Sequence, residues 1–175
     1  AFGYFHDNFI GAVERLTDHL AGLPDGPRGK LWRIRSAEVI LAQGAIERPL
    51  VFEGNDTPGV MLASAAKVFA LRYGVAVGQS VALMASHDSG WNDAFALAGA
   101  GVGIAAIIDV RDGVDEALLA EANALGINVR LGHSVIGVRG RLGVKGITVA
   151  RNDGTAASDI TCDALLMAGG WTPTV

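Results

Sequence analysis

Two short apolar runs that each end at a glycine frame most of this chain. The first run, residues 39–42, is followed by Gln43-Gly44, and the second, residues 164–168, is followed by Gly169-Gly170. A continuous apolar run of this length is typical of a buried strand. We therefore predict two equivalent strand ends that bracket an inserted α/β unit.

Between these runs, apolar segments alternate with helical ones. Residues 80–85, 103–109 and 127–131 are apolar runs of strand length, and residues 91–100 and 115–125 have the length of helices and end at glycine. Strands that alternate with helices of 10–15 residues favour a parallel sheet. After them, residues 134–139 and 144–151 are expected to pair as antiparallel strands, and a further helix is predicted over residues 60–72.

The first part of the chain has a different pattern. Residues 1–5, 8–16 and 31–35 predict a three-stranded antiparallel meander, with a loop around Pro24-Asp25-Gly26-Pro27. The meander leads into the predicted strand at residues 39–42.

These patterns predict an α/β fold of the FAD/NAD(P)-binding class: Rossmann-like, with three layers, a nested βαβ unit and an antiparallel β-meander. Residues 1–57 and 158–175 would form a partial outer dinucleotide-binding domain, and residues 58–157 a nested Rossmann-like NAD(P)-binding domain. Both termini lie in or just after a predicted strand, so we expect the chain to be a piece of a longer polypeptide.

Composition narrows the function. Half of the 175 residues are apolar and the net charge is −4, which favours a well-formed core and argues against nucleic-acid binding. Cys162 is the only cysteine, so an internal disulfide and a cysteine-based metal cluster are excluded. No apolar run reaches the roughly 18 residues of a membrane helix, and the expected location is the cytoplasm.

The nested unit carries an incomplete nucleotide motif. The three positions that hold glycine in dinucleotide sites are Ala85, His87 and Gly90, and His87 places bulk where the backbone must approach the pyrophosphate. Asp109 ends the second strand, where an acidic residue holds ribose hydroxyls. Two interpretations stay open: a weakened nucleotide site with Asp109 on the ribose, or a Rossmann-like unit kept only for structure.

The glycine-ended runs are the stronger candidates for cofactor binding. A glycine at the end of a strand lets the backbone run beside a flat cofactor. Arg48 follows the first glycine and is a candidate contact for an anion. The predicted cofactor-binding residues are Gln43, Gly44, Ala45, Arg48, Asp109, Gly169 and Gly170. No residue is assigned a catalytic role, and no pair of histidines has the spacing of metal ligands on a helix.

The same segments carry a resemblance to a family. Residues 41–49, LAQGAIERP, look like the ATG-type motif of flavoproteins with two dinucleotide-binding domains, with Gln43 where Thr is usual, and residues 165–173, LLMAGGWTP, look like the second such motif. With residues 12–20 and 44–66, they resemble the alpha subunit of heterotetrameric sarcosine oxidase, or a close amine or opine oxidase relative.

The resemblance implies an enzyme that oxidatively demethylates sarcosine and carries FAD, covalent FMN and NAD on several subunits. This chain would be the middle of the alpha subunit and one wall of its NAD pocket, not catalytic alone. FAD and FMN would be held elsewhere, and the partners would be the other subunits. Two alternatives stay open: a non-catalytic subunit-interaction module, and a self-sufficient FAD-dependent NAD(P)H oxidoreductase.

Overall fold

The computed structural model describes residues 1–22 and 25–174, which form two compact units. The first unit covers residues 1–43 and the second residues 44–174. Pro24, in the predicted loop, and Val175, the last residue of the predicted outer domain, lie outside the described residues. No helix of the described residues is long and apolar enough to cross a membrane.

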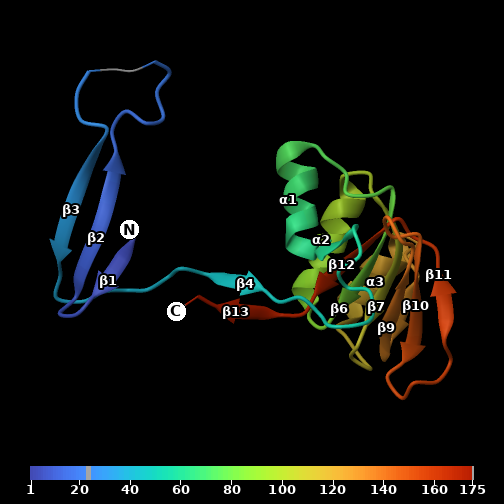
Figure 1. Cartoon of the computed structure of the whole chain (residues 1–175). Coiled ribbons are helices and arrows are strands. Elements are labelled where there is room, and N and C mark those ends of the chain that lie inside the picture. Colours follow the sequence, from blue (N-terminus) through green and yellow to red (C-terminus); the bar gives the residue numbers. More distant parts are fainter. Residues whose placement is uncertain (23–24, 175) are drawn as a thin grey trace. The chain divides into compact units, whose positions relative to one another are not determined.

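The first unit is the predicted meander. Its antiparallel strands, in the order β1-β2-β3, are β1 (Gly3–Phe5), β2 (Phe9–Arg15) and β3 (Gly29–Arg35) (Figure 1). Every residue of β3 is exposed, so the sheet has little core of its own.

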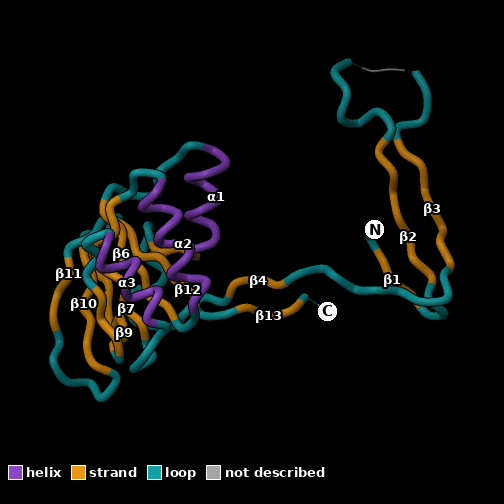
Figure 2. Tube along the Cα trace, turned by 180° about the vertical axis from the view of Figure 1, so that it is seen from behind, coloured by secondary structure: helices purple, strands orange, loops and turns teal. Residues whose placement is uncertain are grey.

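The strand predicted at residues 39–42 is absent. These residues have no regular structure, and Ile40 is 91% exposed. The strand follows the glycine instead: β4 (Ala45–Glu47) pairs antiparallel with β13 (Trp171–Pro173). We call this pair of strands the ribbon (Figure 2). An apolar run forms a strand only beside a partner for its backbone groups, and no strand of the described chain pairs with residues 39–42.

The second unit is built on a parallel sheet of five strands in the order β5-β12-β6-β7-β8. The strands are β5 (Val60–Leu62), β12 (Ala164–Ala168), β6 (Ser80–Ala85), β7 (Gly103–Asp109) and β8 (Val129–Leu131). Residues 60–62 were predicted as helix; they form an edge strand because they pair with β12.

Two further layers cover this sheet. On one face lie α1 (Ala63–Tyr73), α2 (Asp88–Gly99) and α3 (Glu116–Ala124), whose apolar residues share one core with alternate sheet side chains such as Leu83 and Leu166. On the other face lies the antiparallel sheet of β9 (His133–Arg139), β10 (Gly146–Arg151) and β11 (Ser158–Ile160), packed on the remaining sheet side chains, such as Met84 and Leu165. The predicted three-layer α/β fold is confirmed (Figure 1).

The position of β12 differs from the predicted domain boundaries. This strand pairs with β5 on one side and β6 on the other, and all five of its residues are buried. Residues 164–168 therefore belong to the same sheet as the segment 58–157, although residues 158–175 were predicted to join residues 1–57. The boundary between the two compact units lies at Gly44 instead of residue 58.

Candidate functional site

The carboxyl edge of the parallel sheet contains a topological switch point. From β6 the chain continues through β7 and β8 to one side, whereas β12 and β5 lie on the other side. Sheets of this kind bind ligands in the crevice outside the carboxyl ends of the two strands at such a point. Here those strands end at Ala85 and Ala168, and they are followed by the start of α2 and by Gly169-Gly170.

The turn from β6 into α2 keeps one feature of a nucleotide site. A Cβ added at Gly90 would lie 2.6 Å from the Cβ of Ala168 and 3.4 Å from that of Ala85. Gly90 therefore permits the close packing of α2 on the sheet, which is the role of the third glycine in the dinucleotide motif.

Side chains fill the rest of that turn. The Nδ1 atom of His87 is 2.7 Å from the hydroxyl of Ser89, which also accepts a hydrogen bond of 3.0 Å from the indole N–H of Trp171. The rings of His87 and Trp171 lie 6.5 Å apart. These contacts fasten the ribbon strand β13 to the first turn of α2.

Asp109 lies at the predicted strand end, but it is fully buried and both of its oxygens are occupied. Oδ2 accepts from the Trp91 indole at 2.7 Å and from Arg111 Nη2 at 2.8 Å. Oδ1 accepts from the backbone N–H and the Nε of Arg111 at 2.9 and 3.0 Å. The carboxylate thus receives four hydrogen bonds from the chain itself, which leaves it none for a ribose.

The same arginine reaches the start of α2. Its Nη1 atom donates to Asp88 at 2.7 Å, and Asp88 is the first residue of that helix. The hydrogen bond to Asp109 raises the pKa of Arg111 more than burial lowers it, so the guanidinium stays charged. A carboxylate in the first turn of α2 also takes the place where a helix N-terminus favours an anionic ligand.

The ribbon brings together the two glycine-ended segments. The carbonyl of Gly170 accepts from the Arg48 N–H at 2.8 Å, and the carbonyl of Gly44 accepts from the Thr174 N–H at 3.2 Å. The two glycines lie at opposite ends of the ribbon, with φ values of 81° at Gly44 and 101° at Gly170. A Cβ on either would meet no atom within 4 Å, so open space lies beside the backbone at both.

Most of the other predicted cofactor-binding residues lie at or next to the ribbon, and only Asp109 lies elsewhere. Ala45 and Arg48 are exposed residues at the ribbon. The backbone of Gly169 packs against that of Arg48, since a Cβ on Gly169 would lie 2.6 Å from the carbonyl oxygen of Arg48. Gln43 is exposed and is the last residue of the first unit. Asp109 belongs to the strand end at β7 and not to the ribbon.

Sequence reasoning missed Glu47, which is only 3% exposed. Its Oε2 atom accepts the backbone N–H of Ser64, in the first turn of α1, at 3.0 Å. Its Oε1 atom is buried and has no hydrogen-bond partner among the described residues. Nothing in the sequence around Glu47 indicates that its side chain is buried, because its neighbours in the ribbon are exposed.

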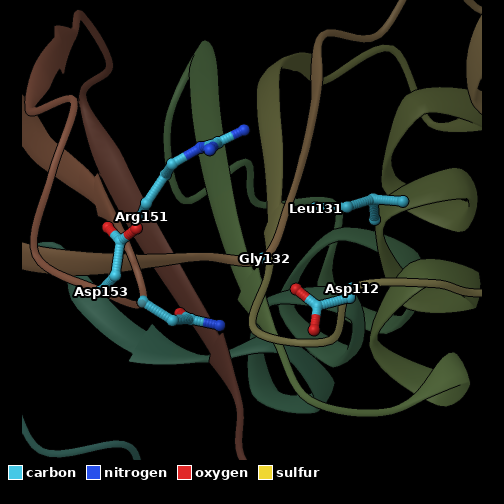
Figure 3. A pocket seen from close by; sticks show the side chains of 6 residues that line it. Asp112, Leu131, Gly132, Arg151 and Asp153 are labelled. Atoms are coloured by element: carbon cyan, nitrogen blue, oxygen red, sulfur yellow. The ribbon is translucent and has the colours of Figure 1, made fainter.

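A polar hollow of about 340 Å³ lies at the ends of β8 and β10 (Figure 3). Asn152 donates to the carbonyls of Gly132 and Val110, which fixes one wall. Hydrogen bonds from Thr155 lower the pKa of Asp153, so this carboxylate stays ionised. The lining residues are Asp112, Leu131, Gly132, Arg151, Asn152 and Asp153. Two carboxylates and one guanidinium give the hollow a net negative charge, which suits an anionic ligand poorly.

No group of three or more metal-ligating side chains occurs in the described parts of the chain.

Sequence comparison gives long matches. The chain is 39% identical over its whole length to sarcosine oxidase subunit alpha of Rhizobium meliloti (strain 1021), and 37% identical over 99% of its length to the subunit of the same name from Corynebacterium sp. (strain P-1). It spans 17% and 18% of the length of these relatives. These matches confirm the resemblance to the alpha subunit. No protein-family model matches the chain.

Structural comparison confirms the fold class. Thioredoxin reductase of Lactococcus lactis superposes with a TM-score of 0.62 at 17% identity, over 83% of this chain and 48% of that one. L-proline dehydrogenase from P. horikoshii superposes with a TM-score of 0.53 at 21% identity, over 97% of this chain and 26% of that one.

Proposed function

We propose that this chain, which matches a segment of sarcosine oxidase alpha subunits along its whole length, is part of an oxidoreductase subunit that acts in the oxidative demethylation of a secondary amine. The support is the identity of 37–39% over at least 99% of the chain. In this proposal NAD is bound by the outer domain of the full-length subunit. FAD and FMN belong to the assembled oxidase, which works in the cytoplasm, and this segment is not catalytic alone.

Within that subunit, we propose that the ribbon lines the dinucleotide cleft. The observation that supports this most directly is the open space beside the backbone of Gly44 and Gly170, where even a Cβ would meet nothing. A flat cofactor can approach a backbone without side chains more closely than any other surface. Gln43, Ala45 and Gly169 adjoin these glycines.

Arg48 is proposed as the anion contact of this cleft. It is exposed, and no acidic side chain of the described residues forms an ion pair with it. A guanidinium of this kind is suited to a phosphate oxygen of a dinucleotide.

Other subunits are the proposed protein partners. α1 presents the exposed apolar side chains Val68, Phe69 and Tyr73, which are 43–60% exposed. Apolar side chains grouped on one helix are typical of a surface covered in an assembly.

The test is Gly44→Val in the full-length subunit, with Gly154→Val as the matched control. Both glycines have φ near 80° and open space at the Cβ position, but Gly154 lies in a turn of the antiparallel sheet. Dinucleotide bound per subunit, measured after release from the purified protein, should fall for Gly44→Val and stay unchanged for Gly154→Val. Equal cofactor content in both variants would contradict the proposed role of the ribbon.

A further inference from the structure

The second unit has the fold of a dinucleotide-binding domain, and the places where such a domain holds the pyrophosphate and the ribose can be located in it. In such a domain the pyrophosphate lies at the turn after the first strand of the motif, against the N-terminus of the following helix. The ribose is held by an acidic residue at the end of the neighbouring strand. In this chain the corresponding places are the turn at residues 85–90 and the carboxylate of Asp109.

The pyrophosphate position is filled by side chains. His87 puts an imidazole where the motif requires a glycine, and that ring is held by Ser89 and lies near Trp171. Asp88 adds a negative charge to the first turn of α2. A pyrophosphate here would meet both steric bulk and charge repulsion.

The ribose position is filled as well. Asp109 is fully buried, and Arg111 and Trp91 donate to both of its oxygens. A ribose hydroxyl would have to displace a hydrogen bond between two charged groups, Arg111 and Asp109, and it would bring no positive charge in place of the guanidinium. The polar hollow beyond the ends of β8 and β10 is lined by Asp112 and Asp153 against the single cation Arg151, so its net charge is negative and disfavours a phosphate.

We infer that residues 85–111 of the second unit bind no dinucleotide, because Asp88, Arg111 and Asp109 form an internal ion network that replaces the ligand, while His87 blocks the turn. The ribbon belongs to the same unit but is a separate site, and its role does not depend on these residues.

The inference is tested by hydrogen exchange of the full-length subunit in the presence of NAD and, separately, NADP. The peptide that covers residues 109–112 should show no change in exchange at any nucleotide concentration. Saturable protection of that peptide would overturn the inference. Protection of residues 43–48 and 169–171 reports on the ribbon instead. Because Trp171 donates to Ser89, a ligand on the ribbon can also slow exchange at residues 85–91, so the peptide that covers residues 109–112 separates the two proposals.

A variant tests the cause. His87→Gly with Asp88→Ser removes the bulk and the charge but leaves the Arg111–Asp109 pair in place. With the fold verified by circular dichroism, this variant should show saturable protection of residues 85–91 at nucleotide concentrations that leave exchange in the unchanged protein unaffected. A folded variant that binds no better than the unchanged protein would show that these side chains are not what excludes the nucleotide.

Discussion

Replacement of Arg111 by glutamine would remove the only cation that contacts a fully buried carboxylate within the described residues. Asp109 is 0% exposed, and two of its four hydrogen bonds come from the Arg111 side chain. After Arg111→Gln the Trp91 indole and the backbone N–H of residue 111 still donate to the carboxylate. The charge itself would then be buried without a counter-ion.

The expected loss is large for one side chain. Removing one partner of a buried ion pair destabilises a protein by about 3–5 kcal/mol. The Arg111 side chain is 31% exposed, so water screens part of its interaction, and we expect the lower end, about 3 kcal/mol. With a typical urea m-value of about 2 kcal/mol/M, this lowers the unfolding midpoint by about 1.5 M.

Urea unfolding followed by far-UV circular dichroism measures this effect, and two further variants make it specific. Asp109→Asn combined with Arg111→Gln removes the buried charge and should regain about 1–2 kcal/mol over Arg111→Gln alone. Arg139→Gln breaks an ion pair of 3.4 Å between side chains that are 47% and 54% exposed, and it should cost less than about 1 kcal/mol. An Arg111→Gln variant within about 0.5 kcal/mol of the unchanged chain would refute the reasoning.

Two other predictions concern packing and the single thiol. Gly90→Ala places a Cβ 2.6 Å from that of Ala168 and should lower the free energy of unfolding by about 1–3 kcal/mol. Gly99→Ala, in open space on the same helix, should be neutral or stabilising. Equal effects of the two variants in urea unfolding would contradict this prediction. Desolvation raises the pKa of the buried Cys162 thiol to about 11. Iodoacetamide at pH 8 should therefore alkylate the folded chain far more slowly than the urea-unfolded chain, and alkylation of the folded chain should speed up as the pH approaches 11. Equal rates of alkylation in the folded and unfolded states would contradict this prediction.

The two glycine-ended runs show how far apolar pattern predicts strands. Residues 164–168 form a strand because β5 and β6 pair with both of its edges. Residues 39–42 are as apolar, yet they are irregular, since no described strand lies beside them. A run of this kind predicts that a segment can be buried in a sheet, but pairing depends on segments distant in the sequence.

The alternatives at Asp109 show a similar limit. The sequence places an aspartate at the correct strand end, and both a ribose contact and an internal ion pair satisfy that position. Arg111 follows two residues later, but only the fold shows that its guanidinium turns back onto Asp109 and also reaches Asp88. The strands at residues 80–85 and 103–109 were predictable because they are continuous apolar runs with a helix between them.

The glycines of the ribbon differ in a way that supports the proposed cofactor site. Gly169 is required by packing alone, because a Cβ there would lie 2.6 Å from the Arg48 carbonyl oxygen. Packing does not explain Gly44 and Gly170, since a Cβ on either would meet nothing within 4 Å. Their φ values of 81° and 101° lie beyond the left-handed region that asparagine tolerates, so the backbone conformation itself selects glycine at both positions. A side chain at Gly44 or Gly170 would cover backbone surface that is now open. A flat ligand needs such open backbone surface in order to lie against the ribbon.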